Sequence, residues 1–187
     1  MDMSERGYAF WTHSLNRLDS YLKDIVVKEK TMSETAVANR QLSVTRVYDA
    51  PRELVFEVCT TAEHIRNWFG CKEMVMTECE IDARVVGQYR FVTVGEGLEC
   101  PLKGEFFEVV APEKLVYSQI YDVEPYSTSV AIVTTILKDL GGKTELTSTI
   151  VFPDSESYAG AMASGMDVGM GQALDRLGEV SVALKQA

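Results

Sequence analysis

The chain has 187 residues, of which 46% are hydrophobic, and a net charge of −10 with an isoelectric point near 4.7. This length suits one domain with a substantial core, and the acidic balance argues against a nucleic-acid partner or a membrane surface, since both are anionic. No apolar run approaches 18 residues and no signal-like segment opens the chain, so we expect a cytoplasmic protein.

Residues 1–31 predict a helix with one apolar stripe, and residues 31–40 read as a small, polar linker. Two interpretations stay open for this segment. The helix packs on its own domain or on a partner subunit, which makes a homodimer possible, or Met32 is the natural start of the protein. We therefore divide the chain into a helical extension with its linker, 1–40, and a main domain, 41–187. The stripe consists of Trp11, Leu15, Leu18, Leu22 and Ile25.

The main domain opens with a strand that begins near Gln41, followed by two short helices. Asp49 is expected to cap the first helix, with Pro51 in its first turn. Thr61 is expected to cap the second, which ends near Trp68.

Six further strands follow, joined by short Gly- or Pro-containing turns that predict antiparallel neighbours. Gly104 inside one of them suggests a bulge or a bend. The chain closes with a long helix, Ser155–Leu184, capped by Ser155, whose glycines predict a kink or a close approach to the sheet. The six strands are 72–82, 87–94, 98–110, 114–122, 128–139 and 143–152.

The order of these motifs resembles the START-like, helix-grip (SRPBCC) superfamily, over roughly residues 41–184. The pattern comprises Ala50-Pro51, Trp68-Phe69-Gly70, Gly87 with Tyr89 and Leu174-Asp175-Arg176-Leu177. Within the superfamily it is similar to the branch named after the activator of the 90-kDa heat-shock-protein ATPase. The resemblance implies an α+β, helix-grip fold: a seven-stranded curved antiparallel sheet wrapping a long C-terminal helix, with two short helices between strands 1 and 2.

Three residues depart from the pattern of that family. Cys71 stands where relatives carry Pro, Val86 where they carry the first of two glycines, and Met166 where they carry Trp. Because Met is slimmer and more flexible than Trp, Met166 is expected to widen the cavity that the resemblance places between sheet and helix.

The chain offers little sign of catalytic chemistry. It carries no nucleophile, phosphate-binding or nicotinamide motif, and we assign no catalytic residue, metal or cofactor. His64 is read as an exposed helix residue, with a role as an acid or base at a pocket rim as the alternative. The four cysteines form no C-x-x-C pair and are expected to be reduced thiols: Cys59, Cys71, Cys79 and Cys100.

A set of aromatic and methionine residues is expected to face the interior from the strands and helices. The set either lines a largely apolar pocket or simply fills the core. Its members are Trp68, Phe69, Tyr89, Phe91, Phe106, Tyr117, Tyr121, Met162, Met166 and Met170. Glu108 is placed on the same inward face.

Three functions remain open. The first is a non-catalytic START-like protein that binds a small hydrophobic or aromatic molecule in this cavity. The second, implied by the resemblance, is an interaction module that acts on a chaperone partner in the stress response. The third is a cyclase- or hydrolase-type enzyme that uses Tyr, Glu or His in the same cavity.

Overall fold

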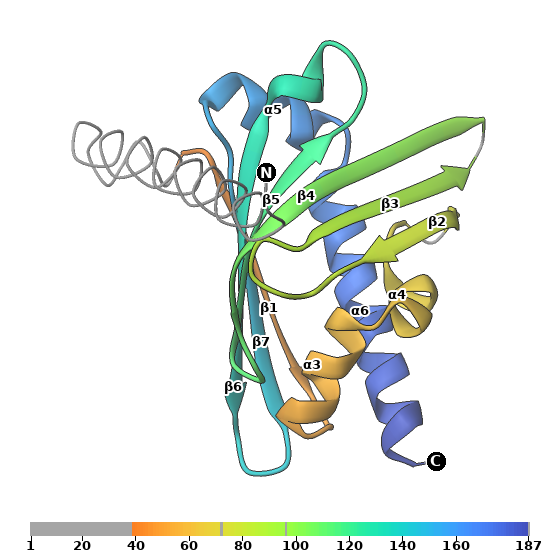
Figure 1. Ribbon diagram of the computed structural model, residues 1–187, viewed down its shortest axis with the longest axis vertical. Helices are drawn as coiled ribbons and strands as arrows, with labels where there is room; N and C mark the ends of the chain where they lie inside the picture. The colour runs from red at the N-terminus through yellow and green to blue at the C-terminus, as the bar shows by residue number, and fades with distance from the viewer. Residues whose placement is uncertain (1–38, 72, 96, 187) are drawn as a thin grey trace, which may run out of the picture. The chain divides into compact units, whose positions relative to one another are not determined.

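The computed structural model describes residues 39–71, 73–95 and 97–186. The predicted helix of residues 1–31 lies outside the described residues. The described part consists of one sheet, four α-helices and one 3-10 turn, labelled as in Figure 1. The strands are β1 Gln41–Tyr48, β2 Val75–Ile81, β3 Gln88–Gly95, β4 Leu98–Val110, β5 Lys114–Tyr121, β6 Val130–Asp139 and β7 Thr144–Val151; the helices are α3 Arg52–Thr60, α4 Ala62–Trp68, η1 Tyr126–Thr128, α5 Ser155–Ala163 and α6 Met166–Lys185.

The seven strands form one sheet in the order β1-β7-β6-β5-β4-β3-β2, and every neighbouring pair is antiparallel. Strands β2 to β7 follow one another in the sheet as they do in the chain. Helices α3 and α4 lie between β1 and β2, and β1 pairs with β7, at the opposite end of the sheet from β2. Figure 1 shows α6 running along the sheet, with α3 and α4 beside it. The predicted α+β, helix-grip architecture is confirmed.

The helix starts differ in detail from the prediction. Pro51 occupies the N-cap position of α3, without a side-chain hydrogen bond, while Asp49 pairs with Lys185 at 3.1 Å. Thr61 does stand at the N-cap of α4, but its side chain makes no capping bond. Both helices therefore depend on tertiary packing, and their buried residues Val55, Val58 and Ile65 supply it.

The C-terminal segment is two helices and not the single helix that was predicted. Gly165 has φ +78°, a left-handed conformation that interrupts the helix between α5 and α6. The cap of α5 is Asp154, whose carboxylate accepts a 2.7 Å hydrogen bond from the Ser157 amide, and not Ser155.

A bulge in β4 explains a second difference. Phe106 pairs with Tyr117, but the register then shifts so that Glu108 pairs with Val116. The extra residue moves Glu108 to the outer face, where it pairs with Lys114 at 2.7 Å, and returns Val109 to the core. The bulge thus lies close to Gly104, the position at which the sequence suggested one.

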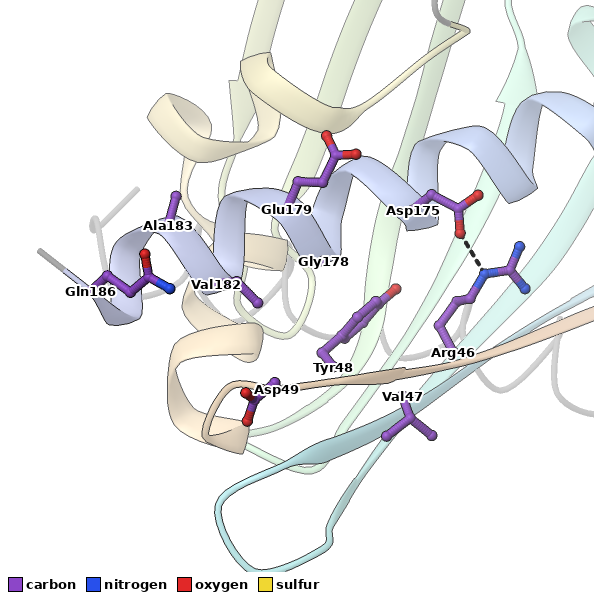
Figure 2. A pocket seen from close by; sticks show the side chains of 10 residues that line it. All are labelled: Arg46, Val47, Tyr48, Asp49, Asp175, Gly178, Glu179, Val182, Ala183 and Gln186. Atoms are coloured by element: carbon purple, nitrogen blue, oxygen red, sulfur yellow. Dashed lines mark hydrogen bonds and ion pairs between the residues drawn. The ribbon is translucent and has the colours of Figure 1, made fainter.

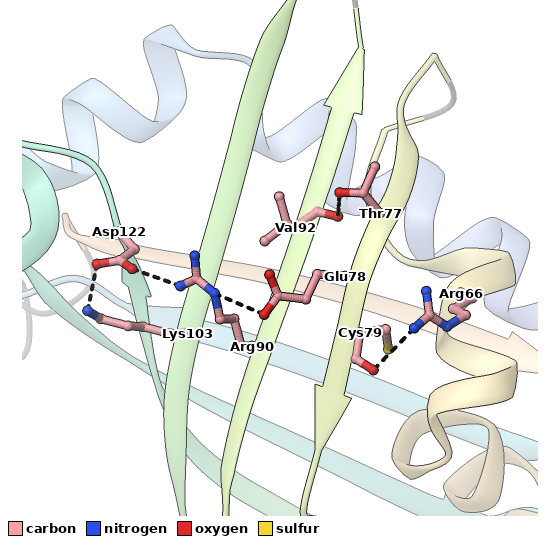
Figure 3. A network of polar contacts seen from close by, with 8 residues as sticks. All are labelled: Arg66, Thr77, Glu78, Cys79, Arg90, Val92, Lys103 and Asp122. Atoms are coloured by element: carbon pink, nitrogen blue, oxygen red, sulfur yellow. Dashed lines mark hydrogen bonds and ion pairs between the residues drawn. The ribbon is translucent and has the colours of Figure 1, made fainter.

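The outer face of the sheet carries a chain of ion pairs across β2, β3 and β4 (Figure 3). Arg90 contacts Glu78 at 3.1 Å and Asp122 at 2.8 Å, and Lys103 contacts Asp122 at 2.5 Å. Hydrogen bonds from Lys103 and Arg90 lower the pKa of the Asp122 carboxyl below its usual range. These contacts link β2, β3 and β4 to one another and to the residue that follows β5.

The helix α6 approaches the sheet closely at Gly178. A β-carbon at this position would lie 2.7 Å from the Tyr48 ring, so the absence of a side chain allows strand β1 and helix to meet. The Tyr48 hydroxyl donates a 2.8 Å hydrogen bond to the Leu174 carbonyl, which fixes the pair further. The C-terminal half of α6 is thereby anchored, and its N-terminal half faces the methionine region described next.

Candidate ligand-binding site

Six of the predicted site residues belong to one aromatic cluster. Their rings lie on α4, the segment after it, and strands β3, β4 and β5, with neighbouring centroids 4.8–5.9 Å apart. These separations are typical of favourable tilted and edge-to-face aromatic contacts. The cluster comprises Trp68, Phe69, Tyr89, Phe91, Phe106 and Tyr117.

The three methionines form the opposite wall, from the helices. Met162 on α5 and Met166 and Met170 on α6 are half-buried and pack against Val133 and Ile150 of the sheet. Tyr117 packs against the same buried sheet residues as the methionines and also belongs to the aromatic cluster, so it links the two predicted sets.

Tyr121 lies apart from the rest. Its side chain is 36% exposed at the end of β5, and its ring packs 6.1 Å from that of Tyr126 in η1. The structure therefore brings nine of the ten predicted residues into two touching groups and leaves Tyr121 at their margin. Whether these residues bind a ligand stays a prediction.

The polar tips in this region have distinct partners. The Tyr89 hydroxyl donates to the Ser118 carbonyl at 3.0 Å, so its donor is already used within the protein. The Tyr117 hydroxyl lies near Thr135, whose own hydroxyl contacts Ser148 at 3.4 Å. Burial raises the pKa of both tyrosines above the ordinary value near 10, so both hydroxyls stay protonated even in moderately alkaline solution.

Sequence reasoning missed two residues of the methionine wall. Phe152 and Tyr158 pack edge-to-face, with centroids 5.7 Å apart, and both belong to the same cluster as the methionines. Buried and half-buried side chains alternate along β7, and extending this alternation by one residue predicts that Phe152 faces the core. The position of Tyr158 could not be predicted in this way, because it depends on how α5 packs on the sheet.

The prediction that His64 is an exposed helix residue is wrong. Its side chain is only 16% accessible, and Nε2 lies 3.7 Å from Glu57 Oε1 on α3. The four cysteines are free thiols, as predicted.

Cys71 lies close to α6. A β-carbon added at Gly169 of this helix would be 2.9 Å from the Cys71 Sγ. Within the described ranges, no three or more His, Cys, Asp or Glu side chains gather closely enough to hold a metal ion.

A separate groove of about 580 Å³ lies between the end of β1 and the C-terminal half of α6 (Figure 2). Arg46 and Asp175 meet across it at 2.6 Å. None of the ten predicted residues lines this groove; of its acidic residues on α6, Asp175 belongs to the family motif noted in the sequence, and Glu179 was not singled out. Its walls are Arg46, Val47, Tyr48, Asp49, Asp175, Gly178, Glu179, Val182, Ala183 and Gln186.

Comparisons with known structures agree on the architecture. A crystal structure of a protein from Rhodobacter sphaeroides shares 26% identity at a TM-score of 0.70, covering 78% of this chain and 95% of that one. A protein from Nitrosomonas europaea matches at 22% identity and a TM-score of 0.71, covering 80% and 99%. One from Arthrobacter aurescens matches at 21% identity and a TM-score of 0.71, covering 79% and 88%. A search of curated proteins found no significant match.

The family assignment comes from the sequence match. Residues 49–181, from the end of β1 through most of α6, fit the model of a family described as activator of Hsp90 ATPase homolog 1-like protein. The helices of the described part include none with both the length and the apolar character needed to cross a bilayer. The chain belongs to the family of activator of Hsp90 ATPase homolog 1-like proteins and has their START-like, helix-grip fold.

Proposed function

We propose that this chain is a non-catalytic cytoplasmic protein that binds a small apolar or aromatic molecule between the sheet and the α5–α6 helices. One observation carries the proposal. Three half-buried methionines on α5 and α6 pack against the same buried sheet residues as Tyr117, which also belongs to the aromatic cluster. Flexible thioethers opposite rigid rings form a wall that adapts to varied ligand shapes.

Polar and redox features are consistent with this proposal. The hydroxyls of Tyr89 and Tyr117 both have partners within the protein, Ser118 and Thr135, so apolar contacts supply the affinity in this proposal. Four free thiols suit a reducing compartment such as the cytoplasm.

A titration with fluorescent aromatic and fatty-acid probes tests the proposal. Wild-type protein is expected to bind with Kd in roughly the micromolar range, since adaptable apolar contacts give permissive rather than tight binding. Met166→Trp is expected to fill the proposed cavity between the sheet and α6 and to raise Kd about tenfold, the result of losing roughly 1.4 kcal/mol. Native mass spectrometry of the purified protein checks independently for a co-purified small molecule.

Val168→Trp is the matched control, because this side chain lies two residues along α6 and is 60% exposed. It is expected to leave Kd unchanged, and both variants should retain the wild-type circular dichroism. If no probe binds wild type below about millimolar concentration, the region is a filled core. An interaction module with a protein partner, which the family description suggests, then becomes the better function.

A further inference from the structure

Sulfur-containing side chains gather around Thr93 on the inner face of β3. Thr93 is only 2% exposed, and its hydroxyl donates to the Met74 Sδ at 3.7 Å. Cys100 stands directly opposite Thr93 in the β3–β4 ladder, so the two side chains share one face of the sheet. A hydrogen bond links Thr93 to the Cys100 thiol. A thioether and a thiol from separate segments therefore meet at the same hydroxyl.

A turn brings the thiol of Cys71 to the same place. The Met74 amide donates to the Cys71 carbonyl at 3.1 Å, which closes a four-residue turn between α4 and β2. The turn begins beside Thr93, because a β-carbon on Gly70 would lie 3.0 Å from the Thr93 Cγ2. It ends against Gly95, where a β-carbon would lie 3.0 Å from the Met74 Cγ. The backbone thus holds Cys71 and Met74 together against β3.

The pKa of the Cys100 thiol shows which groups surround it. Burial raises this pKa, the Cys71 thiol raises it further, and the hydrogen bond with Thr93 lowers it. Such influences act between groups that are close in space, so Cys71 and Cys100 approach each other on the inner face. Helix α6 covers this region, since Gly169 lies against the Cys71 Sγ.

A cation beside the turn favours negative charge on these thiols. Arg176 of α6 donates to the Gly70 carbonyl, which places its guanidinium next to the start of the turn. A nearby guanidinium stabilises a thiolate relative to a thiol. The other two cysteines lack this advantage. Burial raises the pKa of Cys59 to about 12, and it also raises the pKa of Cys79.

The chemistry of the three sulfur atoms selects a metal. Thiolates and thioethers are soft ligands, which suit monovalent copper. Zinc is bound in proteins by thiolate, imidazole and carboxylate groups, so a thioether is a poor ligand for it. The described residues hold no cluster of three His, Cys, Asp or Glu side chains that would suit such an ion. A soft monovalent cation is therefore the best match.

We propose that Cys71, Met74 and Cys100 bind one Cu(I) ion through their three sulfur atoms. Rotation of these side chains replaces their contacts with Thr93 by bonds to the ion. The two thiols lose their protons to solvent on binding, and the copper stays monovalent, so no oxidant or reductant is needed. The site then carries one net negative charge, which the Arg176 guanidinium offsets. None of the three residues belongs to the proposed ligand-binding set, so this proposal stands or falls independently of that one.

The test is an anaerobic titration of the reduced, full-length protein with Cu(I), in competition with the chelator bathocuproine disulfonate. Wild type is expected to bind one equivalent. Cys71→Ser and Cys100→Ser are each expected to raise Kd at least a hundredfold, and Met74→Leu about tenfold, because a neutral thioether is a weaker ligand than a thiolate. X-ray absorption of the wild-type complex is expected to show three sulfur ligands at copper.

Met76→Leu and Cys59→Ala are the matched controls. Met76 lies two residues after Met74 and packs against the aromatic cluster, and Cys59 lies buried on α3. Both variants are expected to change Kd less than threefold. Should a cysteine variant fail to fold, alkylation of wild type gives the same answer. One equivalent of Cu(I) is expected to slow the labelling of Cys71 and Cys100 at least tenfold.

Three results would each overturn the proposal. They are equal Cu(I) affinity in wild type and Met74→Leu, unchanged labelling of Cys71 or Cys100 with one equivalent of Cu(I), and oxygen or nitrogen ligands at the bound copper. A loss of binding in Cys59→Ala that matches the loss in Cys71→Ser would place the ion elsewhere and would equally refute it.

Discussion

Val86 is the residue with the most unusual backbone in the described chain. It has φ 61° in the turn between β2 and β3, a region that β-branched residues rarely occupy. The turn itself is well bonded, since the Val86 amide donates to the Phe106 carbonyl at 2.8 Å. The family pattern has glycine at this position. The hydrogen bonds of the turn therefore hold Val86 in a left-handed conformation that glycine adopts more easily.

Val86→Gly is therefore expected to stabilise the protein by roughly 1 kcal/mol. The left-handed region costs an L-residue about 1–2 kcal/mol, of which the extra freedom of glycine in the unfolded chain returns a part. The measurement is urea denaturation of both proteins. Val85→Gly, one residue earlier and without positive φ, is the control and is expected to destabilise. A loss of stability in Val86→Gly would show that the valine side chain contributes more than its backbone costs.

Buried tyrosines give the protein a specific sensitivity to alkali. Burial raises the pKa of Tyr48 and of Tyr89 above the ordinary value near 10. The folded chain keeps these protons while the unfolded chain loses them, so the stabilisation present below pH 10 is lost as the pH rises. At pH 10.5 we expect each tyrosine to lower the free energy of unfolding by about 1 kcal/mol.

Urea denaturation at pH 8 and pH 10.5 measures this loss. Tyr48→Phe is expected to make the protein less stable at pH 8, because the hydrogen bond to the Leu174 carbonyl disappears, and to reduce the alkaline loss by about 1 kcal/mol. Tyr126→Phe, at a side chain that is 54% exposed, is the comparison and should leave the loss unaltered. An alkaline loss of the same size in Tyr48→Phe and wild type would contradict the assignment.

Among the secondary-structure elements, the α5–α6 pair shows most clearly how local bonds shape the candidate site. Gly165 breaks the helix, so α5 turns onto the sheet at Phe152 and Tyr158 while α6 continues toward β1. One continuous helix from Ser155 would place Met162 and Met166 on a single straight stripe. The break lets the two methionines approach the same region of sheet from separate helices.

The cap of α5 is a direct test of this element. Asp154→Ala is expected to destabilise the protein by about 1 kcal/mol, because it removes the acceptor of the Ser157 amide. Asp154→Asn keeps an acceptor and should cost much less. Thr61→Ala, at the cap of α4 where the side chain makes no capping bond, is expected to cost less than about 0.5 kcal/mol. Equal costs for Asp154→Ala and Asp154→Asn in thermal denaturation would place the contribution outside the cap.

At the scale of the whole molecule, the described residues from Leu42 to Leu184 already form three hydrophobic clusters among themselves. We therefore expect a variant that lacks residues 1–31 to unfold cooperatively in urea. Its m-value should be that of a single domain of its length. Unchanged melting temperature and sedimentation would favour Met32 as the natural start. Lower stability or a changed oligomeric state would favour a packing or dimerisation role for residues 1–31, and loss of the cooperative transition would contradict an independent domain 41–187.

The sequence by itself determined the order of the helices and strands, and the family resemblance implied how they pack. Alternating strands, short turns and the Ala50-Pro51 to Gly70 segment are local signals, and seven antiparallel strands with an inserted helix pair follow from them. The aromatic cluster was equally predictable, since residues two apart on a strand share a face and the core must bury them.

Other features depended on tertiary structure, because they involve groups distant in sequence. The sequence suggested a bulge near Gly104 and a kink at the glycines of the last helix. Only the structure shows that the bulge turns Glu108 to the outer face and that the break falls at Gly165. The groove beside β1 is lined by Arg46 and Tyr48 and by residues of α6 more than 120 positions later in the chain. Local propensity fixes which elements form, but only their packing decides which side chains and backbone groups share one surface.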